Sequence, residues 1–232
     1  MSDSIYKDGS YLDERPGWHV EDSPWKAKNI LRILEKNNLN PKIICEIGCG
    51  AGEILNQLHN TMDSKCLFSG YDISPQAIQL AKERKKERLH FFQEDLIQID
   101  NKNFDLVLAI DLIEHIEDIF QFLRSLRGLG EYKIFHIPLE LSALSILRTS
   151  RLTLSRKQVG HIHYFNKDLA LSILEETGYD ILDYFYTKGS LELPRKTKKS
   201  WFMKWPRLLL DKINSDFCAR LLGGNSLMVL TK

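Results

Sequence analysis

Glycines and acidic side chains gather at one short stretch of the chain, CEIGCGAGEIL. Its three alternate glycines are Gly48, Gly50 and Gly52. Glycine lets a backbone turn tightly and leaves room for a ligand against the main chain. Glu46 precedes these glycines and Glu53 follows them, and carboxylates at such a turn repel phosphate. The stretch therefore predicts a binding site for a small molecule that carries an ammonium or sulfonium group.

Three more acids follow later apolar segments. Asp72, Asp95 and Asp111 each stand at the end of such a segment. In an open parallel sheet, ligands bind at the carboxyl ends of the strands, so these side chains should lie on the ligand side. Asp72 is placed to accept hydrogen bonds from ribose hydroxyls, and Asp95 from an adenine amino group. With a cationic group nearby, these features point to S-adenosylmethionine, whose tail carries an amino group and whose sulfur is cationic.

The order of the elements predicts the fold class. Strands are expected at 42–48, 66–72, 89–95, 104–111, 131–138, 181–187 and 225–232, and helices at 24–38, 52–60, 74–88, 117–130 and 166–180. Ser74 and Asn166 are expected helix caps. Apolar strands that alternate with helices indicate a mostly parallel sheet covered on both faces. We predict an α/β fold, a doubly wound, Rossmann-like sheet of seven strands.

These motifs resemble those of class I S-adenosylmethionine-dependent methyltransferases, in particular the small-molecule branch that includes ubiquinone-biosynthesis O-methyltransferases. The resemblance is carried by ICEIGCGAG, GYDISPQAIQLAKER, FFQEDL and FDLVLAIDLIEHIED, and less sharply by GHIHYFNKDLALSILEETGYDI. It implies that the last strand lies antiparallel beside the fifth. The cofactor-binding positions that we predict with it are Glu46, Gly48, Cys49, Gly50, Gly52, Asp72, Ile73, Asp95, Leu96, Ile110 and Asp111.

The resemblance and the element order together divide the chain, which we expect to be a single methyltransferase domain over residues 1–232. Residues 1–24 form an arm that the resemblance implies to be a lid, with Trp18, His19 and Trp25 at its end. The cofactor-binding core is expected at 25–138. The segments 139–160 and 188–224 break the alternation and are expected to form a cap on the acceptor side.

Histidines are the candidates for the chemistry. Methyl transfer is an in-line displacement in which positioning supplies most of the acceleration, and a base helps when the acceptor is a hydroxyl. His115 matches the Glu–His pair of the resembling enzymes, although it can equally pack beneath the cofactor. His161 and His163 share a face if their segment is extended, and we favour His161 as the base. His136 can face either the pocket or the core.

Metal binding is not expected from the sequence. No cluster of carboxylates suggests magnesium, and the four scattered cysteines form no zinc pattern. We therefore predict metal-independent chemistry and reduced thiols in a cytoplasmic protein. The polar first residues have no signal-peptide pattern, and no apolar run reaches the ~20 residues of a membrane span.

A basic and aromatic segment, RKTKKSWFMKWPR at 195–207, allows two interpretations. It can meet an anionic lipid surface, which would suit a lipid-linked acceptor. We favour the alternative, helices that roof the acceptor pocket with lysines outward and aromatic residues inward. The formal net charge of +1 gives no reason to expect nucleic acid as a partner. The predicted partner is a small-molecule or lipid-linked acceptor, and the oligomeric state stays open.

Our prediction is methyl transfer to an acceptor that is a hydroxyl oxygen by preference. N-methylation, aminopropyl transfer from a decarboxylated relative of the cofactor, and a non-enzymatic S-adenosylmethionine-binding module remain alternatives. A nicotinamide dehydrogenase is disfavoured because Glu53 occupies the third glycine position of the dinucleotide fingerprint.

Overall fold

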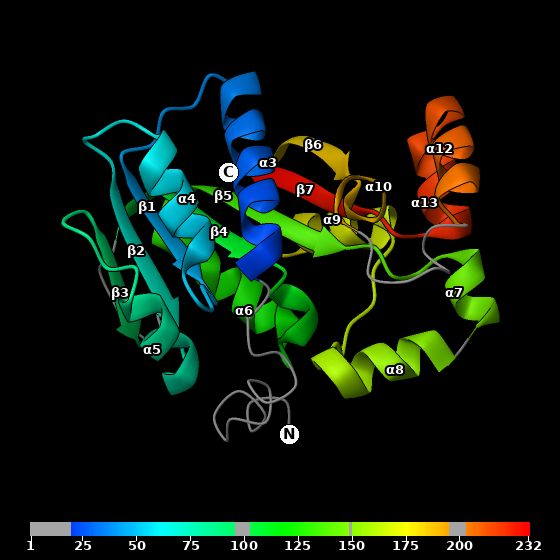
Figure 1. Cartoon of the computed structure of the whole chain (residues 1–232), viewed down its shortest axis with the longest axis horizontal. Helices are drawn as coiled ribbons and strands as arrows, with labels where there is room; N and C mark the ends of the chain where they lie inside the picture. The colour runs from blue at the N-terminus through cyan, green and yellow to red at the C-terminus, as the bar shows by residue number, and fades with distance from the viewer. Residues whose placement is uncertain (1–19, 96–102, 149, 195–202) are drawn as a thin grey trace.

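Seven strands form one mixed sheet in the computed structural model, which describes residues 20–95, 103–148, 150–194 and 203–232 (Figure 1). The strands are β1 Ile43–Ile47, β2 Leu67–Asp72, β3 Leu89–Gln93, β4 Phe104–Ile110, β5 Gly130–Pro138, β6 Ile181–Thr187 and β7 Ser226–Thr231. Their order across the sheet is β3-β2-β1-β4-β5-β7-β6. Strand β7 pairs antiparallel with both neighbours, and the other pairs are parallel. The predicted fold class is confirmed, including the antiparallel last strand beside the fifth.

Helices cover both faces of this sheet. Helices α3 Ser23–Lys36, α4 Glu53–Thr61 and α5 Pro75–Lys82 pack into the apolar cluster of one face, and α6 Ile119–Leu126 and α9 Lys167–Glu176 into that of the other. The remaining helices are α7 Ala143–Leu147, α8 Ser150–Val159, α10 Gly189–Glu192, α12 Lys204–Ile213 and α13 Ser215–Leu222. In Figure 1, α7, α8, α12 and α13 extend to one side of the sheet. Short 3₁₀ turns lie at Val20–Asp22, Ile113–His115 and Arg127–Leu129.

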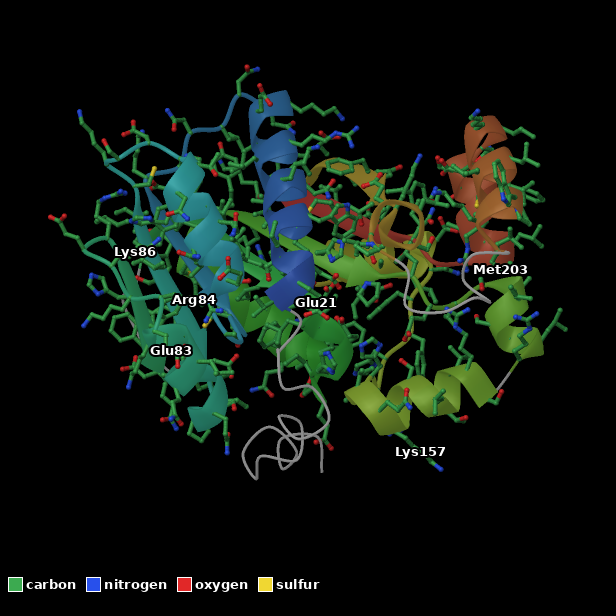
Figure 2. The ribbon with its side chains drawn as sticks, in the orientation of Figure 1. Glu21, Glu83, Arg84, Lys86, Lys157 and Met203 are labelled. Carbon is green, nitrogen blue, oxygen red and sulfur yellow. The ribbon has the colours of Figure 1, made fainter. Side chains whose placement is uncertain are left out.

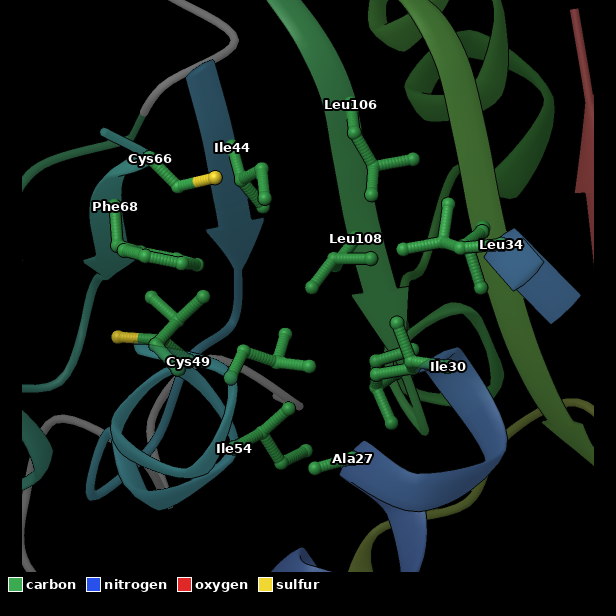
Figure 3. Packing of buried hydrophobic residues seen from close by; sticks show 14 of the residues in the cluster. Ala27, Ile30, Leu34, Ile44, Cys49, Ile54, Cys66, Phe68, Leu106 and Leu108 are labelled. Atoms are coloured by element: carbon green, nitrogen blue, oxygen red, sulfur yellow. The ribbon is translucent and has the colours of Figure 1, made fainter. Parts of the chain in front are cut away.

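Alternation along the central strands explains the two layers. Successive side chains of a strand point to opposite faces. Leu106 and Leu108 of β4 therefore enter the cluster beneath α3 and α4, whereas Val107 enters the cluster beneath α6 and α9. Figure 3 shows Leu108 and Ile30 of α3 in the first of these clusters. Both faces of the sheet are thus buried, as the nearly continuous apolar strands predict.

Some expected bounds differ from the observed ones. Ser74 caps α5 through its side-chain oxygen, as expected, but the helix ends at Lys82 rather than near 88. There the chain turns so that Lys86 can pair with Leu89 ahead of β3. The helix expected at 117–130 is α-helical only to Leu126. The expected helical segment 139–160 is two helices, α7 and α8.

The strand order explains where a ligand can bind. Strands β2 and β3 lie on one side of β1, and β4 and β5 lie on the other. The chain therefore reverses its direction of winding between β1 and β4. In open α/β sheets such a switch point leaves a crevice at the carboxyl ends of the two strands. The loops after β1 and β4 flank this crevice.

The glycine turn after β1 depends on backbone conformations that other residues adopt only with strain. Gly48, Gly50 and Gly52 have φ angles of 67°, 53° and 75°. A Cβ atom on Gly52 would lie 2.4 Å from the ring of Phe91, and one on Gly48 would lie 2.7 Å from Leu112. The glycines therefore allow the turn to pack closely against Phe91 and Leu112, and they also leave space for a ligand beside the main chain.

Replacing Gly52 by alanine tests this constraint. Gly52→Ala combines a left-handed backbone with a steric clash, so we expect the free energy of unfolding to fall by about 2–4 kcal/mol in urea denaturation. Gly128→Ala is the matched control, because no atom lies within 4 Å of its added Cβ. Equal midpoints for the two variants would show that the turn tolerates side chains.

Candidate active site

A cavity of about 450 Å³ opens at the carboxyl ends of β1, β4 and β5. This volume lies within the usual range of small-molecule sites. The glycine turn and the start of α3 form one part of its wall, and the segments after β4 and β5 form another. Helix α8 contributes Leu152, Ser155 and Val159, which share a helix face, while Lys157 of α8 points away into solvent (Figure 2).

Glu46 is the buried acid at the head of this cavity. Its side chain is only 1% exposed, and among the described residues its Oε2 has no hydrogen-bond partner. Burial raises the pKa of Glu46 well above its usual range; Lys26 opposes the shift, and the charges of Asp72 and Asp111 add to it. The site therefore offers an uncompensated carboxyl group that a cationic ligand can ionise.

Asp72 is occupied with the backbone of the glycine turn. Its two oxygens accept hydrogen bonds from the backbone N–H of Gly50 at 2.9 Å and of Ser74 at 2.8 Å. Neither Asp72 nor Ile73 is part of the cavity wall. A carboxylate oxygen can accept more than one hydrogen bond, so ribose hydroxyls could still reach Asp72. Its observed contacts are structural.

The other predicted cofactor residues divide into two groups. Gly48, Cys49, Gly50, Ile110 and Asp111 line the cavity together with Glu46. Burial raises the pKa of the Cys49 thiol well above its usual value, and the charges of Asp72 and Glu46 add to this, so the thiol stays neutral.

Gly52 and Asp95 lie outside the cavity wall. Asp95 is exposed, and it follows β3 after an interval because that strand ends at Gln93. Leu96 lies outside the described residues.

The carboxylate of Asp111 contacts two side chains that can carry a positive charge, Lys26 and His136. Its carboxylate lies 2.6 Å from Nζ of Lys26 and 2.5 Å from Nδ1 of His136. Burial would raise the pKa of Asp111, but the attraction of His136 and Lys26 holds it well below its usual range. Nε2 of His136 contacts Oγ1 of Thr187 at 2.8 Å. His136 is thus buried and engaged at both ring nitrogens.

Lys26 was missed by the sequence analysis. It lines the cavity from the first turn of α3, the helix that follows the N-terminal arm. In the sequence, its position directly after Trp25 was the one feature that could have pointed to a role in the site. Because its partner Asp111 lies far along the chain, their proximity depends on how α3 packs against β4.

Four side chains form a second acidic and imidazole group in the same cavity. The rings of His115 and His161 are 4.8 Å apart between centroids. Nε2 of each lies 4.0 Å from Oε1 of Glu114. Nδ1 of His161 lies 2.7 Å from Oε2 of Glu140. The structure therefore brings two predicted catalytic histidines together, with two carboxylates that the sequence analysis did not select as catalytic.

His163, the third predicted catalytic residue, is separated from this group. Its Nε2 donates to the backbone carbonyl of Ile116 at 2.8 Å, and it does not line the cavity. His161 and His163 therefore do not both face the cavity, and only the favoured His161 lines it. The backbone N–H groups of Ile162 and His163 both donate to the carbonyl of Glu114, which turns the segment locally.

Glu53 lines the cavity but is already paired. Nε of Arg84 lies 2.5 Å from its Oε2 (Figure 2 labels Arg84), and Gln57 donates to Oε1 at 2.7 Å. Burial would raise the pKa of Glu53, but these hydrogen bonds lower it. Its charge is therefore largely compensated, and it contributes less to the preference for a cation than the sequence predicted.

Parts of the expected lid (residues 1–24) and of the expected roof over the acceptor pocket (residues 195–207) lie outside the described residues. These parts include Trp18, His19 and residues 195–202. Trp25 lines the cavity, and its Nε1 donates to Glu192 at 2.6 Å. Within α12, Trp205 is 62% exposed and Arg207 only 6% exposed. The expectation of aromatic residues inward is wrong for Trp205. Arg207 is buried instead and donates to the backbone carbonyl of Leu222, the last residue of α13.

Comparison with known proteins agrees with this geometry. Residues 45–129 match the model of the methyltransferase domain family. Norajmaline N-methyltransferase of Rauvolfia serpentina is 29% identical over 108 residues, which are 44% of this chain and 36% of that enzyme. This chain thus spans about a third of that relative's length.

Two solved structures share the fold. The magnesium protoporphyrin IX methyltransferase of Synechocystis PCC 6803, with bound S-adenosylhomocysteine, superposes with a TM-score of 0.60 at 16% identity and covers 90% of this chain and 82% of its own. The N-methyltransferase NodS of Bradyrhizobium japonicum, in complex with the same product, has a TM-score of 0.56 at 15% identity over 89% and 84%.

The predicted class is borne out to this extent: residues 45–129 match a methyltransferase domain, and the chain shares its fold with a methyltransferase solved with bound S-adenosylmethionine or its product. The predicted cofactor agrees with it. The finer likeness to ubiquinone-biosynthesis enzymes stays a prediction. Within the described part of the chain, no helix is long and apolar enough to cross a bilayer.

Proposed function

We propose that this protein transfers a methyl group from S-adenosylmethionine to a small-molecule or lipid-linked acceptor, with a hydroxyl oxygen as the methylated atom. The observation that carries the proposal is Glu46. This buried carboxyl group, whose Oε2 has no hydrogen-bond partner in the described part of the chain, stands beside a left-handed glycine turn, inside a cavity of suitable size. An ammonium group is the ligand that best compensates such a group, because it supplies both charge and hydrogen bonds.

The cofactor is proposed to lie across the crevice between β1 and β4. Its methionine end would face Glu46 and the glycine turn, its ribose would face Asp72, and its adenine would face Asp95 and Leu96. The reactive methyl group would then point to the part of the cavity that Glu114, His115 and His161 line. Asp111 and Lys26 would close the site from the end of β4.

His161 is proposed to act on the proton of the acceptor. Carboxylates only accept hydrogen bonds, so the contact with Glu140 requires the proton of His161 on Nδ1. Nε2 is then left with a lone pair that faces the cavity. Burial lowers the pKa of His115 to about 4, and His161 adds to this shift, so His115 is neutral near pH 7. His115 can therefore pack against the cofactor without adding a competing positive charge.

N-methylation is the second candidate, since two of the similar proteins are N-methyltransferases. A neutral amine needs no base before the transfer, whereas a hydroxyl gains from one. Aminopropyl transfer remains a weaker alternative, because the acceptor side presents histidines beside its carboxylates. A non-enzymatic binding module predicts cofactor binding without any product.

A lipid-linked acceptor is supported by the exposed face of α12. Trp205, Leu209 and Ile213 lie at i, i+4 and i+8, and each is more than half exposed. Apolar residues at this spacing beside lysines suit an anionic lipid surface. Co-sedimentation with anionic vesicles tests this part of the proposal, and protein that stays in the supernatant restricts the acceptor to small molecules.

We propose the cytoplasm as the location, supported by four free cysteines.

Calorimetric titration with S-adenosylmethionine tests the role of Glu46. We expect Glu46→Gln to weaken binding about 10- to 100-fold, the value of a lost charge-assisted hydrogen bond. Because burial raises the pKa of Glu46 in the free protein, a cationic ligand that ionises Glu46 should release a proton on binding wherever the free carboxyl group is still protonated. Affinity should therefore fall as the pH falls, and Glu46→Gln should abolish the proton release.

Glu53→Gln is the matched control, since Glu53 lines the same cavity but is paired with Arg84. We expect it to change affinity less than about threefold. NAD should not bind to the wild-type protein. Wild-type affinity of Glu46→Gln, or binding of NAD in place of S-adenosylmethionine, would contradict the proposal.

Replacement of His161 tests the catalytic step. With an acceptor found by screening hydroxylated aromatic and polyprenyl-linked compounds, His161→Ala should lower the rate of S-adenosylhomocysteine formation at least about tenfold. Its affinity for S-adenosylmethionine should not change. His90→Ala on β3, outside the cavity wall, serves as the control and should keep the wild-type rate. An unchanged rate for His161→Ala would remove this residue from the mechanism.

A further inference from the structure

The group on the acceptor side of the cavity has the composition of a metal site. Glu114, His115 and His161, which we call the Glu114 cluster, each offer one ligand atom, and these atoms all lie within 4.8 Å of one another. All three residues line the cavity. They come from two segments far apart in the sequence, the turn after β4 and the irregular segment before α9.

Glu114 is the part of the cluster that lacks a partner. Its residue is 0% exposed, and among the described residues neither carboxylate oxygen has a hydrogen-bond partner. Burial raises the pKa of Glu114 well above its usual range, and the charge of Asp111 adds to the shift. A buried carboxyl group is costly unless it is paired, hydrogen-bonded or bound to a metal. The side chain is therefore poised for a cation that enters the cavity.

The cationic side chains of the cavity wall do not fill this role. Nζ of Lys26 lies 2.6 Å from Asp111, and its charge only opposes the rise in the pKa of Glu114 from a greater distance. The charge of Arg151 lowers the pKa of Glu140. Neither cation forms a hydrogen bond with Glu114 in the described part of the chain. What faces Glu114 is a pair of imidazole Nε2 atoms, each 4.0 Å away.

Both histidines form hydrogen bonds with groups outside the Glu114 cluster. Nδ1 of His161 contacts Glu140 at 2.7 Å, and Ser155 donates to the same carboxylate at 2.9 Å. The backbone of Gly160 forms a hydrogen bond with His115. Metal-ligating histidines characteristically engage their second ring nitrogen with a carboxylate or a backbone carbonyl, which fixes the tautomer and frees the other nitrogen for the metal. His161 has this arrangement, since Nδ1 contacts Glu140 while Nε2 is directed to Glu114.

We propose that the Glu114 cluster binds one divalent transition-metal cation, with Zn²⁺ as the best match to its ligands. Two imidazoles and one carboxylate suit zinc and leave a coordination position open to the cavity. Metal-ligand bonds of about 2.0–2.2 Å place neighbouring ligand atoms closer than the present separations, which are 4.0 Å from Glu114 to each histidine and at most 4.8 Å for any pair, so binding must draw the three side chains together.

This proposal replaces the metal-independent chemistry expected from the sequence. In a role that rests on the proposed function, the cation would hold the acceptor oxygen at its open position and lower the pKa of the acceptor's hydroxyl. His161 would then act as a ligand of the cation rather than as the base itself. The binding of the cation, by contrast, can be measured without cofactor or acceptor.

The test is a calorimetric titration of the chelator-treated full chain with Zn²⁺ near pH 7.5. The wild-type protein should bind one equivalent. Glu114→Gln and His161→Ala each remove a ligand and should weaken binding at least about 100-fold, whereas Glu140→Gln removes only the orienting contact and should cost about 10- to 100-fold. His163→Ala is the matched control, because His163 faces the carbonyl of Ile116 and should leave binding unchanged.

A second measurement needs no variant. Addition of Co²⁺ to the wild-type protein should produce the strong visible absorption of a low-coordinate, nitrogen-ligated site, and Zn²⁺ should displace it. The proposal is overturned if the wild-type protein binds no stoichiometric Zn²⁺, if all variants bind alike, or if Co²⁺ keeps its aqueous spectrum. In each of these cases, S-adenosylmethionine binding through Glu46 would be unaffected, so the proposed function would stand.

Discussion

Among the described residues, the cavity has more carboxyl groups than cations to compensate them. Asp111 is paired with Lys26 and His136, and Glu53 with Arg84, but Glu46 and Glu114 keep oxygens without a hydrogen-bond partner there. In a low-dielectric interior such groups either hold a proton or wait for a cation. This shortage of positive charge is the constraint on which our account depends, since it selects a cationic cofactor at one end of the cavity and a metal ion at the other.

The fold creates the constraint by bringing strand ends together. The winding of the sheet reverses between β1 and β4, so Glu46 of β1 and Asp111, which follows β4, meet at one crevice. The glycine turn then folds tightly over this crevice and is held by Asp72. Because both apolar clusters lie beneath the site, the carboxylates stand on rigid elements and cannot relax easily into water.

The sequence could predict whatever depends on local patterns. The alternation of apolar strands and helices predicted the seven strands, and the glycines and Glu46 predicted the place of the cavity. It could not predict the Lys26–Asp111 pair or the meeting of His115 with His161, because these contacts form only when distant segments pack together. Glu140 had no motif around it. The error about Trp205 has the same origin, since α12 turns its neighbour Arg207 inward to a partner on α13, beyond the range of a local pattern.

The most direct test of the central claim is a crystal structure of the protein with S-adenosylhomocysteine. Our account predicts that the product lies in the cavity with its amino group within hydrogen-bond distance of Glu46, and that no other cation takes this place. A complex in which Glu46 stays without a contact, while the ligand lies elsewhere or a phosphate-bearing nucleotide fills the cavity, would contradict it.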